Sequence, residues 1–406
     1  MSLEARLQEC SARGAEGICS LVDEIIAEGL RQRASDIHIG PAADRVLVRF
    51  RLDGVLHPPI AVRTDVPQNV VARLKVLANL LTYQTDVPQE GRIDRDKVGA
   101  PTDLRVSTFP AVGGERVVVR LFDPATQEVR LGELGYPEAV RLELERQLQM
   151  PKGVLLLTGP AGSGKTTTIY AALRYVLASS GGTQNIVTVE DPVESLLPGV
   201  VQTEVRPAAG LTFARCLRSL MRQDPEVVVV GEIRDRETAD IAVEAGLTGH
   251  LVMSTIHSGT ATGVFIRLLE MGVEPYLITS AVNFVVAQRL IRRLCPRCKA
   301  PVGEAEGLLG LPADLLGSAR QPRGCEACFR TGYAGRVPIV ECLKMSETLR
   351  KGIVARVSGE ELQRVAVQGG MRTLTDSALD VVGAGVSSPS EVRRVLGPDA
   401  LRDGSE

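Results

Sequence analysis

The chain has 406 residues, 44% of them hydrophobic, which is enough for at least one large core and suggests two or three domains. Its 47 basic and 49 acidic side chains give a formal net charge of −2, which excludes a global positive field of the kind that holds proteins on nucleic acids. No apolar run approaches the roughly 20 residues that cross a bilayer, and the polar first ten residues are unlike a secretory signal. We therefore expect a cytoplasmic protein, in which eight cysteines favour free thiols or metal ligands over disulfides.

The first part of the chain mixes helical and extended patterns. Apolar residues at helical spacing predict helices over residues 18–30 and 69–81. Short β-like runs predict strands over residues 36–39, 46–52, 104–109 and 115–122. Residues 15–123 are therefore predicted to form a small α+β domain. Residues 124–136 contain Pro and Gly and lack periodicity, which predicts a linker.

From residue 137 onward the pattern changes to alternating strands and helices, which is typical of a parallel α/β sheet. We expect strands over residues 153–158, 185–190, 226–231 and 251–257. The intervening helices are expected to begin near Gly164, Thr212 and Arg236. Residues 137–406 are predicted to form one large domain.

A glycine-rich loop lies directly after the first of these strands and before a helix. It matches the Walker A motif and reads Gly159, Pro160, Ala161, Gly162, Ser163, Gly164, Lys165, Thr166 and Thr167. In such a loop, backbone N–H groups and the helix N-terminus bind phosphate, the lysine contacts the β and γ phosphates, and the hydroxyl of Thr166 binds magnesium. The loop therefore predicts ATP and Mg²⁺ as cofactors. Ala161 replaces a usual threonine, which is compatible with binding through backbone amides.

Two further strands end in carboxylates. Glu190, with Glu194 close behind it, ends the second strand, where it could orient or deprotonate the attacking water. Alone, such a cluster is more often a solvated turn. Glu232 follows the apolar run 227–230 and is expected to position the hydrated magnesium, although an exposed glutamate after a core strand is the plainer alternative. Gly231 occupies the position where many P-loop proteins carry an aspartate.

Two histidines, His250 and His257, frame the fourth strand. A single histidine in a sheet is usually structural. Because this strand is expected beside the nucleotide, the pair predicts a phosphate sensor and a structural partner.

These four elements, in this order, resemble the secretion ATPase superfamily of type II secretion and type IV pilus assembly, over about residues 35–343. The resemblance implies a RecA-like P-loop ATPase core with a parallel sheet. It also implies Mg-dependent ATP hydrolysis by a ring of six identical chains that powers type II protein secretion or type IV pilus or pseudopilus assembly. The implied partners are an inner-membrane platform and cytoplasmic-ring proteins, so the protein would associate peripherally with the inner membrane.

The same resemblance assigns roles to arginines. Arg92, Arg105 and then Arg120 match positions in the N-terminal domain that contact phosphates when this domain closes over the nucleotide. Arg222 and Arg234 match further nucleotide-contacting or coupling positions in the ATPase domain. The alternative is that these are ordinary solvated surface residues.

Two Cys-x-x-Cys pairs, Cys295 with Cys298 and Cys325 with Cys328, can supply four thiolates to a tetrahedral zinc ion. Four thiolates leave no open position, so this zinc would be structural. We therefore predict a zinc-binding subdomain over residues 292–335, followed by a helical region over 340–406. The other four cysteines are expected to be buried.

The tetracysteine pattern resembles the assembly and secretion branch of the superfamily. A pilus retraction or DNA-uptake motor is the first alternative, since retraction motors share the four boxes but usually lack the cysteines. A zinc-ribbon nucleic-acid-binding protein with a vestigial P-loop is the second. The neutral charge and the intact Lys165, Glu190 and Glu232 oppose it, and no direct nucleic-acid partner is expected.

Overall fold

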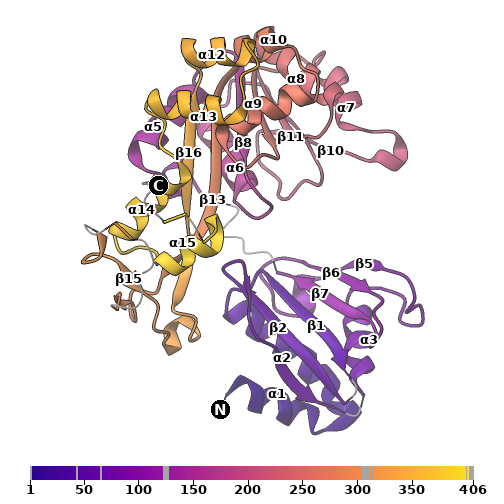
Figure 1. The fold of residues 1–406 in the computed structure, drawn as a ribbon. Coiled ribbons are helices and arrows are strands. Elements are labelled where there is room, and N and C mark those ends of the chain that lie inside the picture. The colour runs from indigo at the N-terminus through magenta and orange to yellow at the C-terminus, as the bar shows by residue number, and fades with distance from the viewer. Residues whose placement is uncertain are drawn as a thin grey trace. The chain divides into compact units, whose positions relative to one another are not determined.

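A computed structural model describes residues 2–42, 44–64, 66–121, 128–303, 311–312, 315–398 and 400–401 (Figure 1). The chain divides into two compact units, Met1–Thr126 and Gln127–Glu406, which are described separately. The expected linker over 124–136 begins among residues 122–127, which lie outside the described part.

The N-terminal unit is an antiparallel sheet with helices. Its elements are α1 (Leu3–Ser11), α2 (Ile18–Arg31), β1 (Asp36–Ala42), β2 (Arg45–Leu52), β3 (Val55–Leu56), β4 (Ile60–Arg63), α3 (Pro67–Leu77), β5 (Gln89–Ile93), β6 (Leu104–Phe109) and β7 (Arg116–Arg120). The strand order is β3-β2-β1-β7-β6-β5, and β4 pairs with β2. This is the small α+β architecture that the patterns of the first part predict.

One face of this sheet forms the core of the unit. On β2, alternate residues Val46, Val48, Phe50 and Leu52 are buried, as expected for a strand with one covered face. Apolar residues of α2 and α3 complete the same cluster. The intervening side chains of each strand therefore lie on the opposite face.

Several details of this unit differ from the sequence expectation, including the unpredicted strands β3, β4 and β5 and a start before residue 15. Helix α3 ends at Leu77 instead of residue 81, because Asn79 adopts a left-handed conformation and the Leu80 N–H donates to the Lys75 carbonyl at 2.8 Å. Helix α1 was not predicted. Its Leu7 is fully buried in the core, but so short a helix with few apolar residues has little periodicity to detect.

The second unit is an α/β structure built on a mixed seven-stranded sheet. Its large sheet consists of β8 (Gly153–Thr158), β9 (Ile186–Glu190), β10 (Val201–Glu204), β11 (Val227–Ile233), β12 (Leu251–Ile256), β13 (Val282–Leu294) and β16 (Tyr333–Lys344), while β14 (Ala300–Pro301) and β15 (Arg320–Gln321) form a separate two-stranded sheet. Its helices are α5 (Glu138–Leu148), α6 (Lys165–Ser179), α7 (Phe213–Leu220), α8 (Arg236–Leu247), α9 (Ala261–Glu270), α10 (Pro275–Ala281), α12 (Glu347–Val354), α13 (Gly359–Gln368), α14 (Leu374–Gly383) and α15 (Pro389–Leu396).

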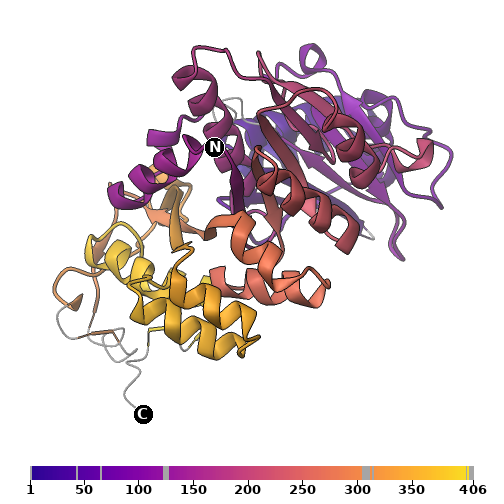
Figure 2. The same ribbon diagram turned by 90° about the horizontal axis from the view of Figure 1, so that it is seen from above.

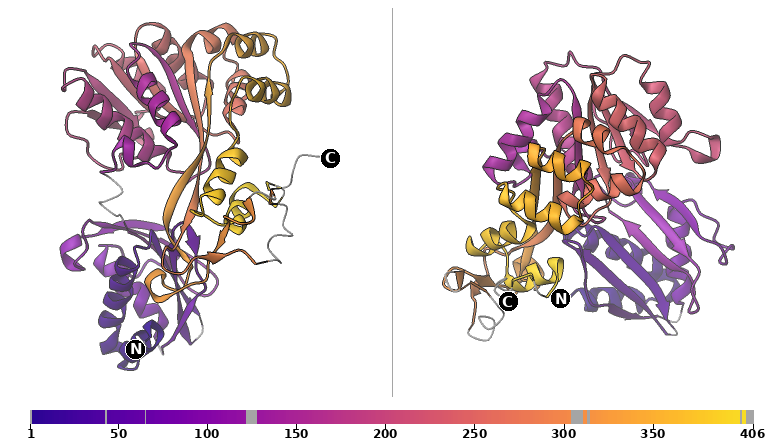
Figure 3. Two further views of the ribbon diagram at one scale, coloured as in Figure 1. Left: turned by 90° about the vertical axis from the view of Figure 1, so that its left-hand side faces the viewer. Right: turned by 45° about the horizontal axis from the view of Figure 1, so that its top comes forward.

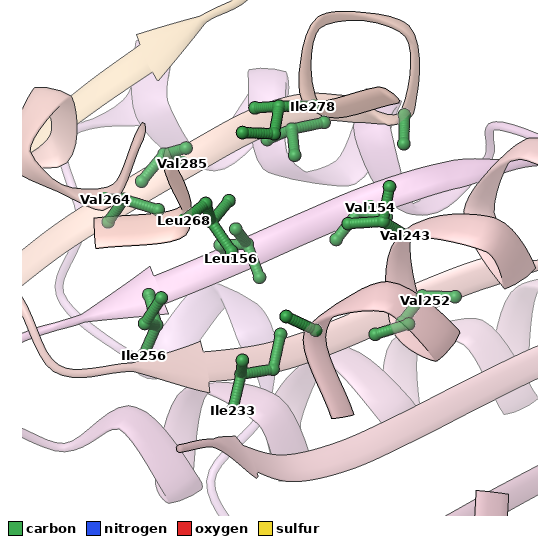
Figure 4. Close-up of a cluster of buried hydrophobic side chains, with 14 of the residues drawn as sticks. Val154, Leu156, Ile233, Val243, Val252, Ile256, Val264, Leu268, Ile278 and Val285 are labelled. Carbon is green, nitrogen blue, oxygen red and sulfur yellow. The ribbon is translucent and has the colours of Figure 1, made fainter. Parts of the chain in front are cut away.

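The large sheet has the order β10-β9-β11-β12-β8-β13-β16 and is covered on both faces. On β8, Val154 and Leu156 pack with α8, α9 and α10 in one apolar cluster (Figure 4), while Leu155 and Leu157 pack with α5 and α6 in another. Helices α6, α7 and α8 begin where the sequence predicted, with Gly164, Thr212 and Asp235 as their N-terminal caps.

The sheet is not wholly parallel, which corrects the expected parallel topology. Six strands are parallel, but β16 pairs antiparallel with β13 at the edge of the sheet. These two strands have 13 and 12 residues, about twice the length of their neighbours, and form the long pair visible in Figure 3. Neither strand was predicted. The chain between their far ends carries the four cysteines of the two pairs.

The C-terminal segment is helical after β16. Helices α12 and α13 lie beside α9 and α10 (Figure 2). Helices α14 and α15 pack against β13 and β16 with Ile291, Ile339 and Val392 in a separate small core. None of the described helices is long and apolar enough to cross a membrane.

Candidate active site

The glycine-rich loop connects the end of β8 to the start of α6. Gly159, Gly162 and Gly164 all have positive φ angles, 149°, 74° and 89°, which glycine adopts at low cost. The loop thereby turns tightly enough for α6 to begin at Lys165 with its N-terminus at the strand end. A helix N-terminus with free backbone N–H groups is a binding site for phosphate.

The side chain of Lys165 folds back over this loop. Its Nζ donates hydrogen bonds to the carbonyl oxygens of Gly159 at 2.7 Å and Pro160 at 3.1 Å. Burial lowers the pKa of Lys165, Arg289 lowers it further, and the carboxylate of Glu232 opposes both. A bound polyanion would favour the charged ammonium and supply it with stronger partners than two carbonyls.

Glu190, at the end of β9, is only 5% exposed and is held by three hydrogen-bond donors. Tyr170 donates to its Oε2 at 2.5 Å, whereas Thr188 and Gln202 donate to its Oε1 at 2.6 Å and 3.1 Å. Burial and the neighbouring Glu190 raise the pKa of Tyr170, so the phenol stays protonated and remains a donor. The position of this carboxylate is therefore fixed by side chains from α6, β9 and β10.

Glu232, near the end of β11, is the second carboxylate of the site. Its Oε2 accepts from Arg234 Nε at 2.5 Å, and its Oε1 lies 2.5 Å from His257 Nε2. The Arg234 guanidinium also lies 3.7 Å from Asp191 Oδ2. Because Arg234 and His257 are both more than half exposed, their contacts with Glu232 are open to exchange with another ligand.

These groups surround one cavity of about 260 Å³. The predicted site residues that line it are Ala161, Gly162, Lys165, Thr166, Glu190, Glu194, Glu232, Arg234 and His257. A lysine, a helix N-terminus and three glutamates thus meet at the carboxyl ends of parallel strands, where open α/β sheets bind ligands. The cavity can hold phosphate against the loop, with Thr166 and Glu232 as oxygen ligands for magnesium.

Other predicted residues of this unit lie in the loop without lining the cavity, or farther away. Pro160, Ser163, Gly164 and Thr167 belong to the loop and the first turn of α6. His250 lies at the opposite end of β12 from His257, where its Nδ1 is 3.0 Å from the Ala245 carbonyl. Arg222 is exposed just after α7.

The three arginines of the N-terminal unit form a row across its sheet. Arg92 pairs with Arg105, Arg105 with Arg120, and Arg120 with Asp36 on β1, which pairs in turn with Arg51. The Asp36 carboxylate accepts from Arg120 Nε at 3.1 Å and lies 3.4 Å from Arg51 Nε. Paired residues point to the same face, so Arg92, Arg105, Arg120 and Arg51 lie on the face opposite the core, where Asp36 contacts the last two. Such a row attracts anions.

The four cysteines of the two pairs come together at the far end of β13 and β16. Their sulfur atoms all lie within 4.8 Å of one another. A tetrahedral ion with metal–sulfur bonds of about 2.3 Å holds sulfurs about 3.8 Å apart. The separations are 3.9 Å for Cys295–Cys325, 3.8 Å for Cys298–Cys328 and 3.7 Å for Cys325–Cys328. The donor set and its spacing therefore fit a tetrahedral metal.

The remaining cysteines do not all fit the expectation that they are buried. Cys216 is buried, but Cys10 and Cys342 are only partly buried and Cys19 is exposed. Cys19 follows Ile18 on α2, on the side of that helix that faces away from the core.

Sequence reasoning missed three residues that shape this site. Tyr170 lies four residues after Thr166, so helical spacing places both on one side of α6 and gives a usable signal. Gln202 reaches Glu190 because β10 pairs in register with β9, and no local sequence pattern indicates this pairing. Gln288 on β13 contacts the glycine-rich loop from 125 residues away in the chain.

A lysine-bearing phosphate loop facing two strand-end carboxylates defines the chain as an ATPase. Comparison with known proteins gives the family. The family model described as "Type II/IV secretion system protein" matches residues 11–394, and the chain belongs to this family.

Curated relatives agree with this assignment. The chain is 44% identical over 381 residues to "Type II secretion system protein E" of Pseudomonas aeruginosa and 42% identical over 381 residues to "Type II secretion system ATPase E" of Vibrio cholerae, covering 93% of this chain and 75% of each relative. It is also 41% identical over 380 residues to "Protein transport protein HofB homolog" of Escherichia coli, covering 93% of this chain and 81% of the relative. The chain is thus a motor ATPase of the secretion and pilus class.

Solved structures share the fold. The ATPase DotB of Legionella pneumophila superposes with a TM-score of 0.65 at 19% identity, covering 92% of this chain and 94% of that one. The pilus retraction motor PilT, solved with bound ADP, gives a TM-score of 0.59 at 23% identity, covering 92% and 96%. At these identities the likeness concerns the fold alone.

Proposed function

We propose that this chain hydrolyses ATP with magnesium in the cavity at the ends of β8, β9 and β11, within a RecA-like P-loop core. We further propose that hydrolysis drives a ring of identical chains that powers type II protein secretion or type IV pilus or pseudopilus assembly. The observation that carries the proposal is that Lys165, Glu190 and Glu232 line one cavity. Their positions in the chain span three strand ends, and a shared cavity is what hydrolysis at one phosphate requires.

The phosphates are held by the loop from Gly159 to Thr167. Backbone N–H groups at the start of α6 and the Lys165 ammonium contact the β and γ phosphates, and the Thr166 hydroxyl with Glu232 would hold magnesium. Magnesium bound there would supply positive charge against the charge that develops on the phosphate oxygens. The carbonyls that now accept from Lys165 release its ammonium when phosphate arrives.

Glu190 orients the attacking water. An ionised carboxylate has about four acceptor positions. Tyr170, Thr188 and Gln202 fill three of them, with two on Oε1 and one on Oε2. One position on Oε2 is therefore available for a water proton, and the three donors fix its direction. Orientation by a rigid acceptor is the role that a water-positioning residue fulfils in phosphoryl transfer.

His257 and Arg234 sense the γ-phosphate. Both now contact Glu232, so a ligand that occupied this carboxylate would leave the Arg234 guanidinium and the His257 imidazole available to the phosphate. Arg222 is proposed to couple neighbouring chains, while the contacts of His250 support a structural role.

The arginine row supplies positive charge from the N-terminal unit. Arg92, Arg105 and Arg120 contact the phosphates when this unit closes over a nucleotide, as arginine fingers do in other phosphoryl-transfer enzymes. The cross-strand pairing supports this role, because like charges placed opposite one another cost stability and favour an anionic partner.

The tetracysteine cluster binds a structural zinc ion. Four thiolates at tetrahedral spacing favour zinc among the common cellular metals and leave it no open coordination position. The zinc ion would thereby hold together the chain segment that connects the end of β13 to the start of β16.

The ring comprises six chains and works inside a secretion or pilus machine at the cytoplasmic face of the inner membrane. A membrane platform and cytoplasmic-ring proteins are its partners. The support for these assignments is the family and the names of the relatives at 41–44% identity, which include a protein transport protein.

The site assignment is tested with Lys165→Ala and Glu232→Gln. Lys165→Ala is expected to weaken nucleotide binding about 10- to 100-fold, because a charge-assisted contact is lost. Glu232→Gln is expected to retain nucleotide binding and to lower turnover at least about 100-fold. Wild-type turnover in both variants would refute the assignment. Turnover that depends on added DNA would favour a DNA-uptake motor instead.

A further inference from the structure

Strand β13 runs directly behind the glycine-rich loop. It lies parallel to β8, with Ala287 opposite Thr158, so the next residue of β13, Gln288, lies beside Gly159, where the loop begins. Gln288 is only 2% exposed, although its amide is strongly polar. A buried amide must find partners for its donors and its acceptor, so its contacts identify its purpose.

The amide of Gln288 has partners on both sides. Its Nε2 donates to the Ser163 carbonyl at 2.5 Å. Its Oε1 accepts from the Tyr136 hydroxyl at 2.5 Å and from the Thr168 hydroxyl at 3.2 Å. The Ser163 carbonyl can only accept, so the nitrogen must face the loop. Burial raises the pKa of Tyr136, which keeps its hydroxyl protonated and able to donate.

The loop packs against Gln288 at both ends. A Cβ atom on Gly159 would lie 2.4 Å from the Gln288 carbonyl oxygen, and one on Gly164 would lie 2.8 Å from its Nε2. At Gly159 the close atom is the main-chain oxygen of residue 288 and at Gly164 it is the side-chain amide, so both glycines lie against this residue, in addition to their positive φ angles. The loop takes its shape from this strand as well as from its own sequence.

The hydrogen bond to Ser163 determines the direction of one peptide group. In a trans peptide the carbonyl of one residue and the N–H of the next point in opposite directions. Gln288 holds the Ser163 carbonyl toward β13, so the Gly164 N–H points away from β13. Gly162 and Lys165, on either side of this peptide, line the cavity. The orientation of the Gly164 N–H is thereby fixed, and on the proposed function this group is a phosphate donor.

We propose that Gln288 is a positioning residue for the nucleotide phosphates, and that Tyr136 holds its amide in the working orientation. The proposal rests on the proposed function, in which this loop binds phosphate. Gln288 acts through the loop and does not itself contact the nucleotide.

The test uses Gln288→Met and Gln288→Glu, with ADP and magnesium titrated into the full chain by calorimetry. Gln288→Met keeps the length but leaves the Ser163 carbonyl without its donor, so we expect the Kd for ADP to rise about tenfold. Gln147→Met is the matched control, because Gln147 is 5% exposed and its amide donates to Glu143 on α5. The control is expected to lower the Tm to a similar extent while leaving the Kd for ADP unchanged.

Gln288→Glu adds a pH readout that a merely structural role would not produce. The introduced carboxyl retains an acceptor for Tyr136 and Thr168 but repels the Ser163 carbonyl when ionised. When protonated it can donate again. We expect its ADP affinity, relative to wild type at the same pH, to recover toward the wild-type value as the pH falls.

The outcomes separate this inference from the function on which it rests. ADP binding by Lys165→Ala at wild-type strength would overturn the proposed function itself. Loss of binding in Lys165→Ala together with wild-type Kd values in both Gln288 variants would overturn the inference alone, as would an equal loss in Gln147→Met. If Gln288→Met does not fold, the Kd for ADP of Tyr136→Phe tests the inference instead. A rise of about threefold in its Kd supports the inference, and an unchanged Kd overturns it.

Discussion

The hydroxyl of Tyr170 donates a 2.5 Å hydrogen bond to Oε2 of Glu190, which joins the helix after the phosphate loop to the carboxylate at the end of β9. The same hydroxyl accepts from the Glu194 N–H at 3.3 Å. Tyr170 therefore connects three parts of the cavity, namely α6, the end of β9 and the loop that follows it. If phosphate binding moves α6, the Tyr170–Glu190 hydrogen bond transmits this movement to the carboxylate proposed to orient water.

Replacing Tyr170 with Phe is expected to lower kcat about five- to tenfold while leaving the KM for ATP near its wild-type value. The loss corresponds to one net hydrogen bond, about 1 kcal/mol, from a group that holds Glu190 but does not touch the phosphates directly. Steady-state ATPase kinetics measure both constants. Tyr175→Phe on the same helix is the control, because the hydroxyl of Tyr175 accepts from Gln149 outside the cavity. A raised KM with unchanged kcat would contradict the proposed role of Tyr170.

The sequence predicted local features well and distant partners poorly. The loop from Gly159 to Thr167 could be predicted because its glycines and lysine are contiguous and their order reflects the chemistry. The cysteine pairs were found for the same reason, since each pair forms one turn. Tyr170 and Gln202, by contrast, reach Glu190 over 20 and 12 residues through helix packing and strand register.

The long strand pair β13–β16 was still harder to predict, because its contacts join residues that are even farther apart in the sequence. Tyr136 and Gln288 are 152 residues apart, so nothing local couples them. β13 begins as an apolar run directly after the short helix α10, and its length alone does not distinguish a strand from a helix. Its antiparallel partner β16 is separated from it by 38 residues, which include the cysteine segment. Only the tertiary structure brings these strands together behind the phosphate loop.

Freshly purified protein is expected to contain about one zinc ion per chain, measured by elemental analysis. The double variant Cys295→Ser, Cys298→Ser should lose this metal and lower the Tm, because metal binding stabilises only the folded cluster. Cys19→Ser is the control, since Cys19 is exposed on α2 and outside the cluster. Metal-free wild-type protein, or a double variant with full zinc content, would remove the zinc assignment.

Acid is expected to weaken the C-terminal helices through Glu391. Burial alone would raise the pKa of this carboxyl, but hydrogen bonds from Arg394 and Arg292 outweigh it and lower the pKa below the ordinary value of 4.5. Its contribution to stability is therefore fully present above pH 4.5 and is lost as the pH falls through the lowered value. Thermal unfolding between pH 3 and 7 should show this decline.

Glu391→Gln tests the ion pair between Glu391 and Arg292 at neutral pH. The change leaves Arg292, whose side chain is 13% exposed, without its anion, and is expected to cost about 3–5 kcal/mol of stability. The acid decline below pH 4.5 should also become shallower. Glu347→Gln on α12 serves as the control because this carboxylate is exposed. An equally steep acid decline in Glu391→Gln would assign the effect to other carboxylates.

If the arginine row assists ATP hydrolysis, removing one of its arginines should lower turnover. Arg105→Ala is expected to lower kcat at least about tenfold with little change in nucleotide affinity, because in the proposed function the guanidinium acts only when the N-terminal unit closes over a nucleotide. Arg45→Ala on the same sheet is the control, since Arg45 is paired with its neighbour Asp44. Its ATPase activity should match wild type.

Mixing two defective variants then shows whether the arginine row acts on nucleotide bound to its own chain or to a neighbouring chain. Lys165→Ala chains keep the arginine row but have a defective phosphate loop, whereas Arg105→Ala chains have an intact loop and a defective row. If the row acts on a neighbouring chain, mixed rings place an intact row over an intact loop, and turnover should rise above the sum of the separate variants. If the row acts within its own chain, each chain keeps one defect in every ring. Turnover equal to the sum at all mixing ratios would therefore contradict action between chains.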